Sequence, residues 1–321
     1  MIYVLFDKGK GISFIEKILG TESVKEIRSP QCRHKLKSWL LGVFKVLYVS
    51  NRNDTIICWY DFQAVLCFWG CKLLFLKRRI VCLNVLLKDK LTMKNRLVSK
   101  LYRKALLSNH FKASVSSELY GKWLNKKMGV NVQYTLVHDV YHDSYECKNK
   151  TVLGNRNTVF CGGRNGRDWD FMIRVAESMP HVQFDMIMPK DAYVKYKQRF
   201  TPNINAKCNV AYGEFMETLC TSSLVCLPLD TEAPAGLIVM FQAAANEKMV
   251  ITTDTVTTKE YISENRGALL PNDVHQWGNA IKYYLENSEE RKGCAEKLKS
   301  FLKTECSEQI FVDNIKKMIQ C

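Results

Sequence analysis

The sequence predicts an α/β protein of two domains, each with a parallel sheet covered by helices on both faces. The chain has 321 residues, and domains of roughly 150 residues each are the expectation for that length. Its composition, 47% hydrophobic and 25% charged, is that of a globular chain with a large core. Short apolar runs alternate with segments of helical spacing, which implies parallel strands joined by helices.

The first half begins with an apolar run that leads into a loop and a helical repeat. This order, over residues 2–19 with Gly9 and Gly11 in the loop, is typical of nucleotide-binding domains, although the third glycine of their fingerprint is missing. Further strands are predicted at residues 46–49, 55–59, 80–85, 113–115 and 133–137, and helices at residues 35–43, 62–76 and 92–107. A polar connector, residues 138–156, follows, and we expect the domain boundary near residue 150.

The second half alternates strands and helices regularly. Strands are predicted at residues 158–161, 182–188, 207–210, 224–227, 249–252 and 267–270. Helices are predicted at residues 168–178, 190–199, 214–222, 236–246, 259–263, 273–286, 288–303 and 309–319. Asp168 is a suitable N-cap for the first of these helices.

The positive charge of the chain is concentrated in its first half. Residues 1–150 carry 27 Lys and Arg against 11 Asp and Glu, whereas residues 151–321 carry 20 against 21. Such asymmetry indicates an anionic partner: a membrane surface, a phosphorylated substrate or a nucleic acid. No nucleic-acid-binding motif is present, so we expect no nucleic-acid partner. The basic helix predicted at residues 92–107 is either a solvated outer face or a contact to anionic lipid headgroups.

The 13 cysteines do not have the spacing of a disulfide framework or a zinc site. None forms a C-x-x-C pair and many lie in apolar runs, so we expect reduced, mostly buried thiols and no bound metal. The first residues do not resemble a signal peptide, and the most apolar window, residues 64–76, is too short to span a membrane. A buried helix is the simpler interpretation of that window, and we expect a cytoplasmic protein.

Three loops that follow strands of the second half carry the residues suited to chemistry, because ligands of such sheets bind beyond the carboxyl ends of the strands. The first loop combines Gly162 and Gly163, which let the backbone approach a ligand, with Arg164 and Arg167, which offer forked donors to phosphate oxygens. The helix that follows directs its N-terminal amides into the same space. A diphosphate is the predicted ligand; the alternative is a surface loop with solvated arginines.

The second and third loops reach the same rim of the sheet. In the second, Glu232 is suited to accept hydrogen bonds from sugar hydroxyls, and the amides of Gly236 and Leu237 open a helix. The alternative is that Asp230 or Thr231 caps a turn. The third loop follows the strand at residues 249–252, where small hydroxyl residues either line the site or cap the next helix.

Together these segments resemble the donor-binding domain of the retaining GT-B glycosyltransferases known as group 1 or family 4. The resemblance runs from about residue 158 to residue 287 and matches four motifs in order: GGRNGRD, the acidic motif at residues 232–242, EKMVITTD and GALLP. It implies two Rossmann-like domains facing each other across a cleft. Residues 1–150 would be the acceptor side and residues 151–321 the donor side, with the last helix packing back on the first domain.

Carried over position by position, the resemblance assigns roles to single residues. Arg164 and Arg167 would hold the donor diphosphate, and Glu232 would contact hydroxyls of the transferred sugar. These three are the expected catalytic residues. Gly236 and Leu237 would offer backbone amides to the donor.

Other positions complete the expected donor site or depart from the family. Gly162, Gly163 and Gly11 would lie beside the donor phosphates. Gln242 stands where the family has a second glutamate that binds the nucleotide ribose, and its spacing from Glu232 is longer than in the family. No histidine follows the fourth strand, where many members have one near the reacting carbon.

The resemblance implies transfer of a hexose or related sugar from a nucleoside diphosphate to an acceptor hydroxyl with retention of configuration. Arginines would replace a metal, and the only small molecule required is the nucleotide-sugar donor. The basic first half suggests a lipid-linked or growing surface glycan, as in capsule or O-antigen synthesis, and a peripheral position on the inner face of the plasma membrane. The alternative is a catalytically degenerate member that serves as the binding partner of another enzyme, which Gln242 and the missing histidine favour.

Overall fold

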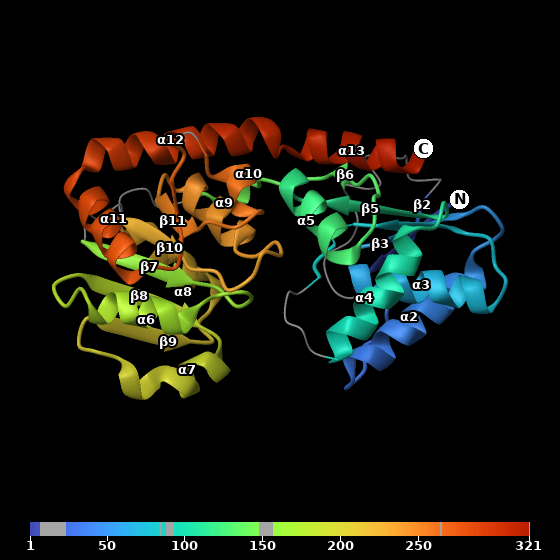
Figure 1. The fold of residues 1–321 in the computed structure, drawn as a ribbon, viewed down its shortest axis with the longest axis horizontal. Helices are drawn as coiled ribbons and strands as arrows, with labels where there is room; N and C mark the ends of the chain where they lie inside the picture. Colours follow the sequence, from blue (N-terminus) through green and yellow to red (C-terminus); the bar gives the residue numbers. More distant parts are fainter. Residues whose placement is uncertain (7–23, 84, 88–92, 148–156, 264, 321) are drawn as a thin grey trace. The chain divides into compact units, whose positions relative to one another are not determined.

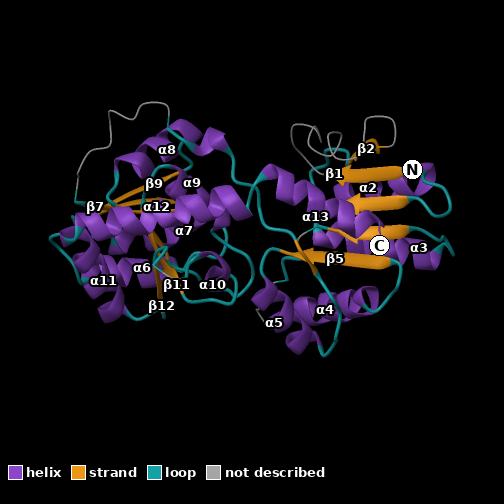
Figure 2. Ribbon diagram, turned by 90° about the horizontal axis from the view of Figure 1, so that it is seen from above, coloured by secondary structure: helices purple, strands orange, loops and turns teal. Residues whose placement is uncertain are grey.

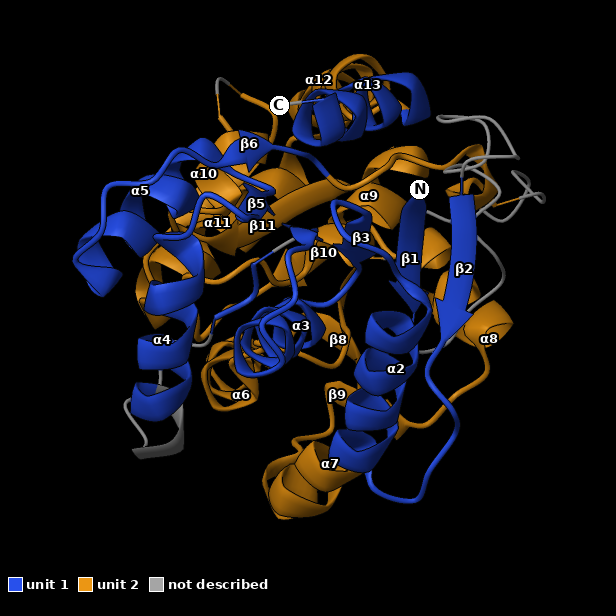
Figure 3. Ribbon diagram, turned by 90° about the vertical axis from the view of Figure 1, so that its right-hand side faces the viewer, with its two compact units in different colours: residues 1–138, 308–321 blue, residues 139–307 orange. Residues whose placement is uncertain are grey.

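The computed structural model describes residues 1–6, 24–83, 85–87, 93–147, 157–263 and 265–320 (Figure 1). They divide into two compact units (Figure 3). Unit 1 comprises Met1–His138 and Glu308–Cys321, so the last helix belongs with the first part of the chain, and unit 2 comprises Asp139–Ser307. The expected boundary at residue 150 lies outside the described residues.

Unit 1 contains a sheet of six parallel strands in the order β2-β1-β3-β4-β5-β6 (Figure 2). The strands are β1 (Ile2–Phe6), β2 (Val24–Arg28), β3 (Thr55–Cys58), β4 (Arg79–Cys82), β5 (Phe111–Val115) and β6 (Thr135–Leu136). The described helices are α2 (Lys35–Val49), α3 (Asp61–Leu73), α4 (Met93–Leu106), α5 (Glu118–Met128) and α13 (Glu308–Gln320). Helices α2, α3 and α4 lie on one face of the sheet and α13 on the other (Figure 3).

The central strands of this sheet are buried on both faces, as is usual for a parallel sheet. Ile56, Ile57, Ile80 and Val81 are all at most 2% exposed, as expected for strands that helices cover on both faces. The strand predicted at residues 46–49 is wrong, because these residues form the last turn of α2. Their apolar, partly β-branched sequence fits a strand locally, but Val46 and Leu47 pack inward from a helix.

Helix α3 confirms the predicted buried helix over most of its length. Its inner face, which includes Ala64, Val65 and Phe68, is buried. The residues at its end, Leu73 and Leu74, are exposed instead. No described helix is both long enough and apolar enough to cross a membrane.

Unit 2 contains a second sheet of six parallel strands, in the order β12-β11-β10-β7-β8-β9. The strands are β7 (Thr158–Gly162), β8 (Gln183–Met188), β9 (Ile204–Cys208), β10 (Leu224–Leu227), β11 (Met249–Thr253) and β12 (Ala268–Leu270). The described helices are α6 (Trp169–Glu177), α7 (Lys190–Tyr196), α8 (Tyr212–Thr221), α9 (Leu237–Ala245), α10 (Thr258–Tyr261), α11 (Val274–Glu286) and α12 (Ser288–Glu305), with short 3₁₀ turns at Asp143–Tyr145 and Lys197–Arg199.

The strand order of unit 2 is that of a doubly wound nucleotide-binding sheet. From β7 the chain adds β8 and β9 on one side and then returns to add β10, β11 and β12 on the other, so the switch point lies between β7 and β10. Two apolar clusters, one on each face, hold it together. Helices α8, α9 and α12 contribute to one cluster, and α6 and α11 contribute to the other around the fully buried Trp277. The fold is therefore α/β with two parallel sheets, as the sequence predicts.

Most predicted boundaries in unit 2 agree with the structure within a few residues. Asp168 caps α6 as predicted, because its side chain accepts a hydrogen bond from the Phe171 amide at 3.0 Å. The strand predicted at residues 207–210 begins earlier, at Ile204, and ends at Cys208. Asn209 follows with a φ of 54°, a left-handed conformation that ends the strand.

One pair of cysteines departs from the expectation of reduced thiols. Cys147, in the connector, and Cys220, in α8, form a disulfide. The other described cysteines are free, and most are buried. The pair is separated by 73 residues, so no local spacing in the sequence could reveal it.

Asn203 offers a test of how unit 2 is held together, since this buried side chain donates to the carbonyls of Ala176, Met179 and Val182 at 3.0 Å each. We expect Asn203→Ala to lower the free energy of unfolding by about 1–3 kcal/mol, because it leaves buried carbonyls unpaired. Urea denaturation measures this loss. The exposed Asn205, replaced by Ala, is the matched control and should change stability by less than about 0.5 kcal/mol; equal losses in both variants would contradict this account.

Candidate functional site

The loops after β7 and β10 meet where the sheet of unit 2 reverses its winding. Strands β7 and β10 pair in parallel, so their carboxyl ends open at the same edge. A crevice between two such loops is where doubly wound sheets bind ligands. The backbone ties the loops together: the Asp168 amide donates to the Pro228 carbonyl at 3.0 Å, and the Asp230 amide donates to the Gly166 carbonyl at 3.1 Å.

The glycines of the first loop leave room that no side chain could share. A Cβ at Gly162 would lie 2.4 Å from the Phe160 ring, and Gly163 has a φ of 128°, which L-residues rarely adopt. A Cβ at Gly166 would collide with Ala235 and Thr231 of the second loop. The two loops therefore touch directly, and the sequence motif that contains these glycines is required by close packing.

Arg167 lies at the centre of this contact. Its side chain is buried, at 7% exposure, and it donates from Nε to the Gly162 carbonyl at 3.0 Å and from Nη1 to the Asn165 carbonyl at 3.2 Å. A Cβ at Gly236 would lie 3.1 Å from Nη1, so the guanidinium lies beside the N-terminus of α9. A cation and a helix N-terminus thus meet at one point, as required to bind an anion.

The charge balance around Arg167 also favours an anionic ligand. Burial lowers the pKa of its guanidinium, and no carboxylate among the described residues pairs with it. Burial also raises the pKa of the neighbouring Cys161 thiol to about 12, so that thiol supplies no negative charge at neutral pH. A buried cation without a counter-charge is costly, and an anionic ligand would supply that charge.

Glu232 lies on the second loop and reaches the third. Its carboxylate Oε2 accepts from the Val256 amide at 2.8 Å, and its backbone carbonyl accepts from the Thr257 hydroxyl at 2.8 Å. The side chain is half-buried. The structure thus joins the Glu232 loop to the loop after β11, and the contacts of Gly166 join it to the loop that carries Arg167.

A polar network that the sequence does not reveal completes the rim. Thr253 at the end of β11 accepts from the Leu229 amide at 2.7 Å and donates to Asn272 Oδ1 at 2.6 Å. Asn272 Nδ2 in turn donates to the Leu229 carbonyl at 3.0 Å and to Asp168 at 3.2 Å. The loops after β7, β10, β11 and β12 are therefore cross-linked. The hydroxyl residues after β11 were the only signal in the sequence, and Thr255 and Thr258 among them do cap a turn.

The remaining expected site residues differ in their surroundings. Arg164 is exposed on the first loop, and Leu237 begins α9 directly after Gly236. Gln242 is buried in α9, where its amide Nε2 donates to the Tyr212 hydroxyl at 3.3 Å and its Oε1 has no hydrogen-bond partner among the described residues. Gly11 and the position expected for the family histidine lie outside the described residues.

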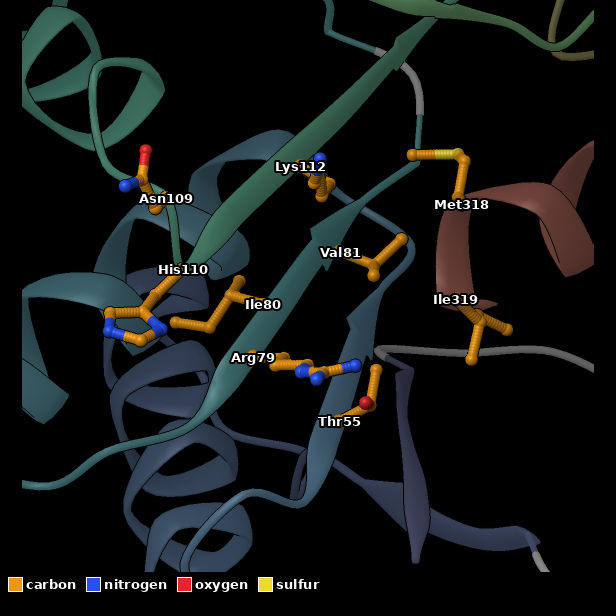
Figure 4. Close-up of a pocket in the computed structure, with 9 residues that line it drawn as sticks. All are labelled: Thr55, Arg79, Ile80, Val81, Asn109, His110, Lys112, Met318 and Ile319. Atoms are coloured by element: carbon orange, nitrogen blue, oxygen red, sulfur yellow. The ribbon is translucent and has the colours of Figure 1, made fainter. Parts of the chain in front are cut away.

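No cluster of metal-binding side chains occurs among the described residues. The structure also has a pocket of about 220 Å³ in unit 1, at the amino ends of β3, β4 and β5. Its lining includes Arg79, His110 and Lys112 and, from α13, Met318 and Ile319 (Figure 4). This edge is opposite to the one at which doubly wound sheets bind ligands. We therefore place the candidate site at the β7–β10 rim.

Solved structures similar to this chain include glycosyltransferases. A sucrose-phosphate synthase from Thermosynechococcus elongatus has a TM-score of 0.79 at 11% identity, with 99% of this chain and 98% of that chain covered. HepE from Anabaena, in complex with UDP and glucose, has a TM-score of 0.76 at 13% identity, with 99% of each chain covered. The chain has the GT-B fold.

A third GT-B structure, a UDP-forming α,α-trehalose-phosphate synthase from Burkholderia xenovorans in complex with glucose-6-phosphate, has a TM-score of 0.69 at 10% identity. The similarity covers 91% of this chain and 79% of the synthase chain. No family model and no curated protein sequence matches the chain. At this level of identity, the GT-B fold is what the similarity shows.

Thr253 provides a test of the rim network. We expect Thr253→Val to lower the free energy of unfolding by about 1–3 kcal/mol, because it keeps the shape but leaves the buried Leu229 amide without an acceptor. Chemical denaturation followed by circular dichroism measures the change. Thr221→Val, which removes a half-buried hydroxyl that donates to the Glu217 and Thr218 carbonyls within α8, is the control. A loss no greater than that of the control would show that the network does not support the rim.

Proposed function

We propose that this protein is a glycosyltransferase that moves a sugar from a nucleoside diphosphate to an acceptor hydroxyl with retention of configuration. The observation that carries the proposal is the buried guanidinium of Arg167, which lies beside the N-terminus of α9 and pairs with no carboxylate in the described part of the chain. The anion that fits such a position is a diphosphate. Structures of HepE with UDP and with UDP-glucose, on the same fold, support that choice.

The hard step of such a reaction is the departure of the nucleoside diphosphate. The bond between the anomeric carbon and the diphosphate oxygen breaks with its electron pair on oxygen, while the acceptor oxygen bonds to that carbon and passes its proton to the departing diphosphate. Negative charge develops on the leaving oxygen, and Arg167, the exposed Arg164 and the amides of Gly236 and Leu237 would stabilise it. No metal is required for this stabilisation, because the arginines supply the positive charge.

The other residues of the rim would orient the donor. Gly162 and Gly163 would let the phosphates approach the backbone, Glu232 would accept hydrogen bonds from the hydroxyls of the transferred hexose, and Gln242 would lie toward the ribose. The acceptor that we propose is a lipid-linked or growing surface glycan, such as a capsule or O-antigen precursor. The positive charge of residues 1–150 supports an acceptor that carries phosphate.

A second candidate function is a catalytically inactive relative that binds another enzyme. The state of Gln242 favours it, because this side chain is buried and donates to Tyr212, whereas a ribose-binding group must be free to meet its ligand. The two candidates differ in one measurement. An active enzyme releases nucleoside diphosphate from its donor when an acceptor is present, and an inactive relative does not.

Replacing Arg167 tests the diphosphate site. UDP-glucose should raise the melting temperature of the wild-type protein, because it binds only the folded state, and should leave that of Arg167→Met unchanged. Transfer should fall by about 10²–10³-fold. Stability without ligand should change little, because the loss of the hydrogen bonds to the Gly162 and Asn165 carbonyls opposes the gain from removing a buried charge.

The control for this experiment is Arg174→Met on α6, whose side chain is 52% exposed and pairs with Asp170. It should retain both the thermal shift and the transfer activity. Should Arg167→Met bind UDP-glucose as tightly as the wild type, the diphosphate would have to lie elsewhere.

Replacing Glu232 tests contact with the transferred sugar. Glu232→Ala should lower transfer by about 10²-fold. It should lower the free energy of unfolding by about 1.5–3 kcal/mol, because the carboxylate accepts a hydrogen bond from the Val256 amide. Radiolabelled donor assays and urea denaturation give the two values. Glu214→Ala, an exposed carboxylate of α8, is the control. Full activity of Glu232→Ala would remove this residue from the proposed site.

A further inference from the structure

Helix α2 of unit 1 is apolar on its outer face as well as on its inner one. Val43, Val46 and Leu47 are buried against the sheet and α3. On the opposite side, Leu40 and Leu41 are 49% and 41% exposed, Phe44 is 67% exposed and Tyr48 is 82% exposed. The rings of Phe44 and Tyr48 stack with their centroids 6.5 Å apart. An outer helix face normally carries polar residues, so this one requires an explanation.

The apolar surface continues onto the end of α3. Leu73 is 78% exposed, Leu74 is 53% exposed and Phe75, in the left-handed conformation with a φ of 54°, is 94% exposed. The two helices lie side by side (Figure 3), and a Cβ at Gly70 would touch the Leu47 side chain, one residue before Tyr48. We call the surface formed by Leu40, Leu41, Phe44, Tyr48, Leu73, Leu74 and Phe75 the docking face.

Basic side chains surround the docking face. Lys37 and Lys45 are exposed on α2, and Lys72 and Lys77 are exposed around the end of α3. Lys72 and Lys104 of α4 both lie over the Trp69 ring, at 5.3 Å and 5.8 Å from its centroid. The sequence contains no Asp or Glu between residues 27 and 53 or between residues 62 and 88. The surface thus combines large apolar side chains with lysines, and none of Lys37, Lys45, Lys72 and Lys77 pairs with a carboxylate of the described residues.

We propose that the docking face binds the surface of an anionic lipid bilayer. Phe44, Tyr48, Leu73 and Phe75 would enter the boundary between headgroups and acyl chains, and the lysines would contact lipid phosphates. The proposal replaces the basic helix at residues 92–107 as the main lipid contact. The docking face exposes seven large apolar side chains, whereas the described part of that segment exposes two, Leu97 and Leu107. It develops the membrane-linked acceptor of the proposed function, but it can be tested without donor or acceptor.

Charge argues against a second copy of the chain as the occupant. In a two-fold dimer the docking face of one copy would contact the docking face of the other. The lysines of the two copies would then lie close together and repel each other. An anionic bilayer offers acyl chains to the apolar side chains and negatively charged headgroups to the lysines.

Sedimentation of the full-length protein with vesicles tests the proposal. The wild type should bind vesicles that contain phosphatidylglycerol, bind vesicles of phosphatidylcholine alone more weakly, and lose binding as sodium chloride rises. The double variant Phe44→Ser, Phe75→Ser should bind at least about tenfold more weakly at every salt concentration. The variant with Gln at Lys37, Lys45, Lys72 and Lys77 should lose the preference for anionic lipid and most of the salt dependence.

Val194→Ser, which removes a 55% exposed apolar side chain from α7 of unit 2, is the matched control and should bind as the wild type does. Circular dichroism checks that each variant is folded, which is expected because the replaced side chains are exposed. Binding of the double variant equal to that of the wild type would overturn the proposal, as would the absence of vesicle binding at low salt. Self-association that Phe44→Ser abolishes, without vesicle binding, would assign the docking face to a second copy instead. Donor-dependent thermal shifts are measured separately, so failure here leaves the donor site standing.

Discussion

The buried guanidinium of Arg167 is the constraint on which the candidate site depends. It fills the space between the glycine turn after β7 and the start of α9, and its hydrogen bonds to the Gly162 and Asn165 carbonyls fix the shape of that turn. The glycines are needed because side chains there would collide with the guanidinium or with the second loop. One charged group thus determines both the local sequence and the contact between two loops that lie far apart in the chain.

Arg167 is a buried charge that pairs with no carboxylate of the described residues, which is destabilising, and the surrounding network offsets part of that cost. Asp168, the residue after Arg167, caps α6 and accepts a hydrogen bond from the Asn272 side chain. It therefore fixes the positions of α6, the rim and the arginine relative to one another. Thr253 and Asn272 satisfy the Leu229 backbone, which pairs with Arg167 in an antiparallel bridge. Sites that bind strongly charged ligands commonly retain such local instability, because the ligand supplies the missing charge when it binds.

Sequence patterns predicted unit 2 better than unit 1 for a physical reason. In unit 2 the central strands β7, β10 and β11 are fully buried runs bounded by glycine, proline or polar residues, as at β10, which ends before Pro228. In unit 1 only Ile27 of the edge strand β2, VKEIR, is buried. Three of its five residues are charged, so the sequence pattern does not predict a strand there. The first site loop was predictable because it follows a strand directly. The Thr253–Asn272 network, the burial of Gln242 and the disulfide of Cys147 depend on how distant loops pack, which one sequence does not encode locally.

The wrong strand at residues 46–49 and the docking face have the same origin. Helix α2 carries large apolar residues on its outer face as well as on its inner one. Its sequence therefore lacks the clear division into a polar and an apolar face by which a surface helix is recognised, and its last turn resembles a strand. A helix of this kind is ordinarily buried on every side. Here the sheet and α3 bury only one side, and Phe44 and Tyr48 remain exposed on the other. The feature that misled the sequence interpretation is therefore itself an argument that α2 has a second, apolar environment, and the lysines around it indicate that this environment is negatively charged at its surface.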